Sequence, residues 1–155
     1  MLGIMTITPF AAARRICEIG NWRVTNMKLN KILYLAQMIY MGEHNGEPLI
    51  NGRFEAWDYG PVQPDVYLKA KIFGAGPIKN IFWEVAPSES EEISALNAVA
   101  NFLLDKSLAE LVTMTHWNKG AWAKNYVPGI NGAVIPFADI IAEYNARLKS
   151  QITHT

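Results

Sequence analysis

Residues 25–42 read TNMKLNKILYLAQMIYMG, and this stretch decides the fold. Thr25 or Asn26 suits the N-cap of a helix and Gly42 is a residue type that ends helices, so one helix is predicted to about Met41. Helical spacing joins a regular apolar stripe made of Leu29, Ile32, Leu33, Ala36, Ile39 and Tyr40. A second apolar row lies on another side and is made of Tyr34, Met38 and Met41.

Few polar residues remain on this helix, mainly Lys28, Asn30, Lys31 and Gln37. A helix with apolar residues on nearly every side is either central to the fold or shared with a partner surface. Burial within the monomer is the favoured interpretation, and a partner surface is the alternative.

Start and stop signals predict further helices on both sides of this one. Thr8 followed by Pro9 predicts a helix over 9–19, and Pro64 opens a short helix that closes near Gly74. Ser88 with Glu91, and Ser107 with Glu110, each match the S-x-x-E capping pattern, the first helix running to about Leu104. Pro136 begins a final helix with its apolar residues in register at Phe137, Ile140, Ile141, Tyr144 and Leu148.

Extended structure is predicted only between these helices. The stretch from His44 to Gln63 lacks a helical period, and residues 54–59 partly alternate apolar and polar side chains as a strand would. Residues 78–85, bounded by prolines, form a candidate partner strand. The predicted fold is therefore mainly α: a single compact helical domain over 1–150 with a small β element, and a tail at 151–155 that we expect to fray.

Composition limits the classes of function. The formal net charge is +0, which argues against a protein built to neutralise many phosphates. Five basic residues cluster near the N-terminus, however, and keep a nucleic-acid-binding regulator open as an alternative; they are Arg14, Arg15, Arg23, Lys28 and Lys31. No leader and no long apolar run is recognisable, so we expect a cytoplasmic protein without a membrane span.

Catalytic patterns are not recognisable. Cys17 is the only cysteine, and it lies on the apolar face of its helix, where a thiol is usually an inert core residue. Scattered histidines supply no zinc-ligand spacing, so neither a metal nor a cofactor is predicted. An enzyme centred on His116 and nearby carboxylates is the remaining catalytic alternative, and a closed polar pocket at His116 would favour it.

Two aromatic clusters stand out instead. The first is FEAWDYGPV over residues 54–62, a rigid corner that contains Trp57 and Tyr59; the second is HWNKGAW over residues 116–122. Residue chemistry favours core aromatics with satisfied polar tips, and a helix C-cap at His116. The alternative is a binding surface, because Trp and Tyr concentrate in interface hot spots.

The same residues resemble a known family. KLNKILYLAQ at 28–37, FEAWDYGPV at 54–62 followed by Val66-Tyr67, and Thr115-His116 followed by Ala121-Trp122 resemble the Panacea domain. This is the family of the SocA antitoxin and of phage-associated GepA-like proteins, and the resemblance spans roughly 27–122.

The resemblance implies an antitoxin that neutralises a cognate toxin protein by direct contact, and it further implies an adaptor that delivers this toxin to the ClpXP protease. It implies no catalytic residue. Candidate partner-binding residues are Tyr34, Met38, Met41, Trp57, Tyr59, His116, Trp117 and Trp122. For such a role, part of the surface around Tyr34, Met38 and Met41 should be accessible in the free protein, whereas Trp57, Tyr59 and Pro61 should chiefly hold the corner.

Overall fold

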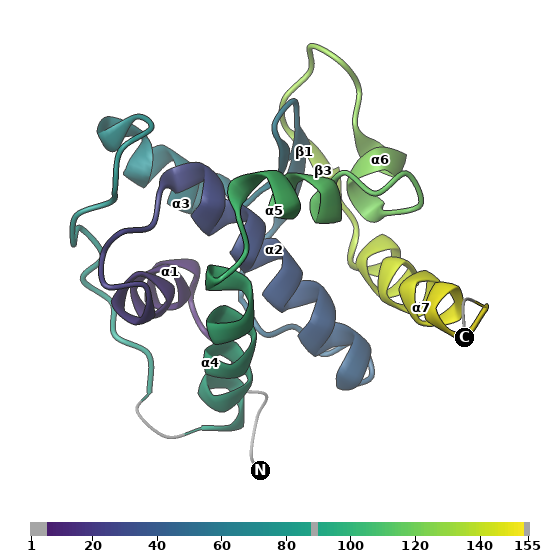
Figure 1. Ribbon diagram of the computed structural model, residues 1–155, viewed down its shortest axis with the longest axis horizontal. Coiled ribbons are helices and arrows are strands. Elements are labelled where there is room, and N and C mark those ends of the chain that lie inside the picture. Colours follow the sequence, from purple (N-terminus) through teal and green to yellow (C-terminus); the bar gives the residue numbers. More distant parts are fainter. Residues whose placement is uncertain (1–5, 88–89, 154–155) are drawn as a thin grey trace.

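Helix α2 (Asn26–Glu43) runs through the middle of the molecule, and other elements pack around it (Figure 1). The computed structural model describes residues 6–87 and 90–153. Elements that contact α2 are α1 (Pro9–Ile19), α3 (Pro64–Ala70), α4 (Glu91–Leu104), α5 (Leu108–Thr115), α7 (Phe137–Thr153) and strand β2 (Gly60–Val62). The fold is mainly helical with a small sheet, as predicted.

The start of α2 is confirmed and its end is not. Thr25 is the N-cap, and its hydroxyl accepts a hydrogen bond from the Lys28 amide at 3.3 Å. The helix continues through Gly42 to Glu43, so the prediction that Gly42 ends it is wrong. A Cβ at Gly42 would lie 2.0 Å from Cγ of Tyr144 on α7. The glycine therefore allows α7 to pack closely against α2.

Both apolar rows of α2 are buried, apart from Ile39, which is half-buried. Tyr34, Met38 and Met41 are 0%, 3% and 0% exposed, so the expectation that this row is partly accessible in the free protein is wrong. The reason is that α4, α5 and α7 pack around the helix, and the sequence of α2 alone does not show that these helices cover it. Burial extends to polar residues, because Lys31 is only 1% exposed and Gln37 is fully buried.

Helix caps follow the sequence closely. Thr8 caps α1, and α3 passes into a single 3-10 turn, η1 (Lys71–Phe73), that ends at Gly74. Ser107 caps α5 by accepting from the Glu110 amide at 3.1 Å. The N-cap of α4 is Ser90 and not Ser88, which lies outside the described residues.

The sheet is antiparallel with the strand order β2-β1-β3, where β1 is Phe54–Trp57 and β3 is Ala133–Ile135. A tight hairpin joins β1 to β2, with Trp57 opposite Gly60. The other neighbour of β1 is β3, which pairs Ile135 with Phe54. The extended segment predicted at 54–59 is confirmed in its position.

The prediction that residues 78–85 pair with this strand is wrong, because β3 occupies the open edge of β1. The 78–85 segment packs on α1 instead. Phe82 is fully buried and its ring stacks on Phe10 at a centroid distance of 6.0 Å. Arg14 donates to the Phe82 carbonyl at 3.2 Å. The prolines and apolar side chains of this segment therefore serve helix packing and form no ladder.

Two features of the C-terminal part were not predicted. A short helix, α6 (Ala121–Asn125), lies between the helix that Ser107 caps and the final helix, where no helix was predicted. Helix α7 starts after Pro136, as predicted, and continues to Thr153, so residues 151–153, which we expected to fray, are helical. Within residues 6–87 and 90–153, none of the helices combines the length and apolarity that crossing a membrane requires.

Candidate partner-binding groove

The predicted corner is built by the β1–β2 hairpin. Trp57 is half-buried, its ring meets Tyr67 edge-on at 4.8 Å between centroids, and its indole N–H donates to Glu55 at 2.9 Å. Gly60 has a φ of 112°, a backbone conformation that side chains with a Cβ rarely adopt. The chain reverses at Asp58 and Tyr59, and the buried Pro61 lies in β2 opposite Ala56, while the Tyr59 side chain is 60% exposed.

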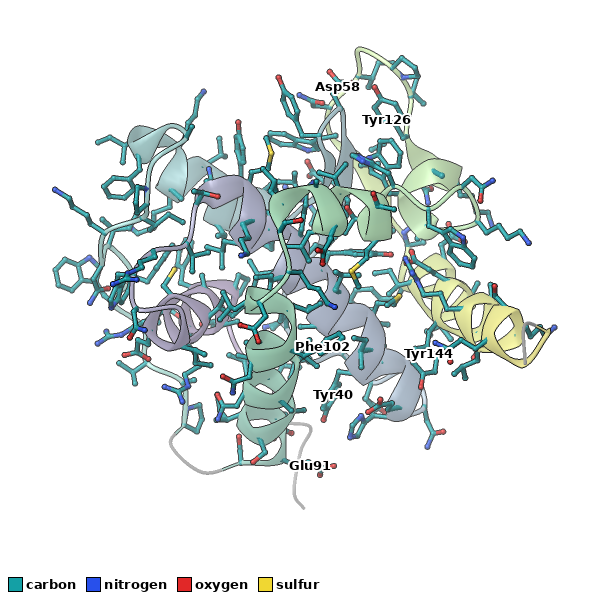
Figure 2. All side chains as sticks on the ribbon, in the orientation of Figure 1. Tyr40, Asp58, Glu91, Phe102, Tyr126 and Tyr144 are labelled. Carbon is teal, nitrogen blue, oxygen red and sulfur yellow. The ribbon has the colours of Figure 1, made fainter. Side chains whose placement is uncertain are left out.

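The fold brings the second aromatic cluster against this corner. Trp122 donates its indole N–H to the Trp57 carbonyl at 2.7 Å, and its ring lies 4.2 Å from that of His116 and 4.5 Å from that of Tyr126. The Tyr126 hydroxyl donates to Asp58 at 2.6 Å. Asp58 and Tyr126 meet at the tip of the sheet in Figure 2. His116 is the C-cap of α5, as predicted.

Behind the corner, three polar side chains converge on Gly60. A Cβ at Gly60 would lie 2.9 Å from Lys31 Nζ, 3.2 Å from His116 Nε2 and 3.6 Å from Thr115 Oγ1. The Lys31 ammonium donates to the Tyr59 carbonyl. Burial lowers the pKa of Lys31 to about 8. The pKa of His116 is lowered by burial and, to a lesser extent, by the charge of Lys31, so its imidazole is neutral near pH 7.

A groove with a volume of about 580 Å³ opens in front of this corner. It lies between the N-terminal turns of α2, the strand β2, the α3–η1 segment and the start of α5. Its walls are mainly apolar and comprise Met27, Tyr59, Pro61, Val62, Tyr67 and Leu108. Polar groups from α2, namely Asn26, Asn30 and Lys31, also line it.

The asparagines of the groove are tied into the fold. Asn30 donates to Asn26 at 2.9 Å and accepts from the Gln63 amide at 2.9 Å. Asn26 in turn donates to the Tyr67 carbonyl at 3.1 Å. These bonds fix the α2 side of the groove against β2 and α3, so the groove is preformed by hydrogen bonds that do not involve a ligand.

The predicted site residues therefore separate into groups. Tyr59 borders the groove and is exposed, whereas the half-buried Trp57, His116 and Trp122 support the corner behind it. Trp117 lies elsewhere, half-buried under the guanidinium of Arg147 at 4.8 Å. Trp57, Tyr59 and Pro61 were predicted to hold the corner. Trp57 is half-buried and Pro61 is buried, but the side chain of Tyr59 is exposed.

The buried row of α2 is held by a polar contact that the sequence pattern does not reveal. The Tyr34 hydroxyl donates to Glu143 of α7 at 2.6 Å, and the Ala121 amide donates to the same carboxylate oxygen at 2.8 Å. Arg147 pairs with the other oxygen at 2.7 Å. Burial, followed by the charge of Glu143, raises the pKa of Tyr34. This carboxylate therefore joins α2, α6 and α7 and satisfies the polar tip of Tyr34.

Sequence reasoning missed Met27, Tyr67, Leu108 and Lys31 as groove residues. Met27 and Lys31 are four residues apart and so share a helix face, which was the available signal. Lys31 was instead interpreted as one of the few polar residues of the helix and as part of the N-terminal basic cluster. Nothing in the α2 sequence indicates that β2 and the loop at Tyr59 cover its ammonium.

The other candidate chemical groups do not assemble around the groove. Cys17 is fully buried, and burial, with a smaller effect of Glu18, raises the pKa of its thiol to about 12. Among the described residues, no group of three or more His, Cys, Asp or Glu side chains could hold a metal ion. His116 contacts Trp122 and faces Gly60, Thr115 and Lys31.

Much of the N-terminal basic cluster is used in internal contacts. Lys28 donates to the Leu104 carbonyl at 2.9 Å, and Arg15 donates to Asn97 at 2.8 Å. Arg14 pairs with Glu18 at 3.5 Å, and Lys31 is buried, whereas Arg23 is exposed. These residues therefore do not form one free basic face for phosphates.

Comparison with known proteins identifies the class to which this fold and groove belong. Residues 29–123 match the family model described as "Antitoxin SocA-like, Panacea domain". This range covers more than half of the chain, so the chain belongs to the SocA-like Panacea family, and the predicted resemblance is confirmed. The match takes in most of α2, the β1–β2 hairpin, α3, α4 and α5, and with them most of the residues that line the groove, although Thr25, Asn26 and Met27 precede the matched range.

A particular relative is Antitoxin SocA of Caulobacter vibrioides (strain NA1000 / CB15N), which is 31% identical to this chain over 113 residues. The alignment covers 64% of this chain and 58% of the relative, so the chain spans little more than half of that protein's length. No solved structure matches the chain.

Proposed function

We propose that this protein is an antitoxin that neutralises a cognate toxin by direct protein contact, and that the groove in front of the Gly60 corner anchors the toxin. Membership of the SocA-like Panacea family supports the antitoxin role. The observation that carries the choice of surface is a preformed, mainly apolar groove, lined mostly by residues of the matched region and bordered by an exposed tyrosine.

Exposed apolar side chains at the groove fit this role. Tyr59, Leu108 and Met27 are 60%, 40% and 38% exposed, although each belongs to a residue type that gains free energy by burial. Tyrosine is enriched in interface hot spots, and methionine adapts its shape to a partner. A segment seated in the groove would cover all three residues together.

The groove is an anchor and not a whole interface. Stable protein complexes bury about 800 Å² on each partner. A groove of about 580 Å³ accommodates a few side chains, so further toxin contacts are needed beyond it. This division of a central anchor and a surrounding contact area is typical of protein interfaces.

A more specific version of the proposal is that this protein delivers the toxin to the ClpXP protease, as the sequence resemblance implies. It predicts that the purified protease degrades the toxin only when this protein is present. Masking alone predicts a stable complex that the protease leaves intact. Either form places the protein in the cytoplasm, where the toxin would be made.

The experiment is co-expression with the product of the neighbouring gene as the toxin candidate. Wild-type protein should restore growth and co-purify with that product. Tyr59→Ala should weaken both effects, whereas Trp83→Ala, which removes a side chain 83% exposed and away from the groove, should not. Rescue without a complex would contradict neutralisation by direct contact, and equal loss in the two variants would contradict the choice of surface.

A further inference from the structure

Lys31 is an unusual residue for the wall of an apolar groove. Its side chain is 1% exposed, yet it lines the groove beside Asn26 and Asn30. Its ammonium donates to the Tyr59 carbonyl. Within residues 6–87 and 90–153, no carboxylate lies within 4.0 Å of this ammonium. Lys31 is therefore a buried cation for which the described part of the chain supplies no carboxylate partner.

Such an arrangement is costly. Burying a charge without an opposite charge disfavours the folded state, and the lowered pKa of Lys31, about 8, is a sign of that cost. An ammonium has three donors, of which the Tyr59 carbonyl takes one. A group that destabilises the free protein and lines an open groove is suited to pairing with an anion that arrives with a partner.

We propose that the groove receives an apolar segment of the partner protein whose glutamate side chain pairs with Lys31, an inference that rests on the proposed antitoxin function. The walls supply Met27, Tyr67 and Leu108 for the apolar side chains of the segment. Lys71 also lines the groove and adds a second positive charge. The occupant is thus complementary in both polarity and charge.

Glutamate fits better than other carboxylates. Proteins typically capture a chain-terminal carboxylate in a nest of backbone N–H groups, whereas the cation here is a side-chain ammonium. Because Lys31 is almost fully covered, the acid must reach inward, and glutamate is one methylene longer than aspartate. His116 is neutral near pH 7 and does not compete for the carboxylate as a second cation.

The first test uses random 12-residue peptides joined to their carrier through the C-terminus, so that only side-chain carboxylates are free. The wild-type protein should enrich peptides with a glutamate between large apolar residues. Lys31→Met should lose these peptides, and Lys79→Met, which alters an exposed lysine outside the groove, should retain them. Thermal melts establish that each variant is folded.

The second test leaves the protein unchanged. Replacing the glutamate of a selected peptide with glutamine should weaken binding to wild type by about thirty-fold or more, as for other buried charge pairs. Enriched peptides without an acid, no enrichment, equal selection by Lys31→Met, or full affinity of the glutamine peptide would each overturn the pairing.

These results are separable from the antitoxin role. If the neighbouring gene's product fails to bind the wild-type protein while glutamate peptides are selected through Lys31, the proposed function fails and the recognition chemistry stands. If that product binds wild type and Lys31→Met equally, and selected peptides lack glutamate, the antitoxin stands and the pairing is wrong.

Discussion

Replacing Lys31 with methionine should stabilise the protein at neutral pH, although it removes a group proposed to bind the partner. Methionine keeps most of the length of the side chain and removes the buried charge. An apolar replacement of a buried charged group is often neutral or stabilising. We expect this gain in stability because Lys31 is buried beneath Tyr59, and no carboxylate of the described residues lies within ion-pair distance of its ammonium.

The size of the effect follows from the pKa. Burial lowers the pKa of Lys31 from 10.5 to about 8, which corresponds to about 3 kcal/mol of unfavourable free energy for the charged form. The unfolded chain binds a proton up to pH 10.5, whereas the folded chain loses it above pH 8. The stability of the wild type therefore gains this free energy as pH rises from about 8 to 10.5.

The assay is denaturant unfolding of wild type and Lys31→Met at several pH values between 7 and 10.5. The variant should be more stable by about 3 kcal/mol at pH 7, and the difference should shrink towards zero at pH 10.5. Raised pKa values of Cys17, Tyr34 and Tyr126 affect both chains and cancel in the difference. A difference that stays constant with pH, or that favours wild type throughout, would refute the reasoning.

Three further variants test the supports of the groove by the same unfolding assay. Gly60→Ala should cost about 1 to 3 kcal/mol because φ is 112° and the new Cβ would meet the Lys31 ammonium; unchanged stability would mean that the corner relaxes. Glu143→Ala should cost about 3 to 5 kcal/mol by stranding Arg147 and the Tyr34 hydroxyl, whereas a small loss would show that water replaces the carboxylate. Trp57→Ala should cost about 2 kcal/mol, less than a fully buried tryptophan, and a loss of partner binding without loss of stability would make Trp57 an interface residue.

Local signals in the sequence were enough to place most helices. Thr8, Thr25 and Ser107 form N-caps with neighbouring amides, so their effect is contained within one turn of chain. The error at Gly42 has a non-local cause. This glycine serves the approach of Tyr144 from a helix far along the chain, and no nearby residue records that contact.

Strand pairing shows the same limit. The alternation at 54–59 predicts a strand, but which segment completes the sheet depends on how α6 and the loop after it bring β3 back to β1. Residues 78–85 carry a strand-like composition and still pack on α1 through Phe82. Composition indicates that a segment is apolar, and tertiary packing decides which surface it covers.

The candidate site was predictable in part. The corner at 54–62 and the aromatic cluster at 116–122 are close in space because Trp122 donates to Trp57, and each is recognisable alone from its residues. The surplus apolar row of α2 was misleading, since a single helix does not reveal that Glu143 of α7 binds Tyr34. Lys31 was not recognised as a buried groove residue, because charged side chains are usually exposed to solvent.

The central claim, that a toxin is held at this groove, is tested most directly by calorimetric titration of the purified toxin candidate into matched variants. Leu108 at the groove and Leu148 on α7 are 40% and 42% exposed, so a glutamate at either position meets a similar environment in the free protein. Glutamate also suits the first turn of α5, next to the Ser107 cap. Leu108→Glu should weaken toxin binding by a hundredfold or more, on the order of 3 kcal/mol, while Leu148→Glu should bind as wild type does. Equal affinity of wild type and a folded Leu108→Glu variant would contradict the account.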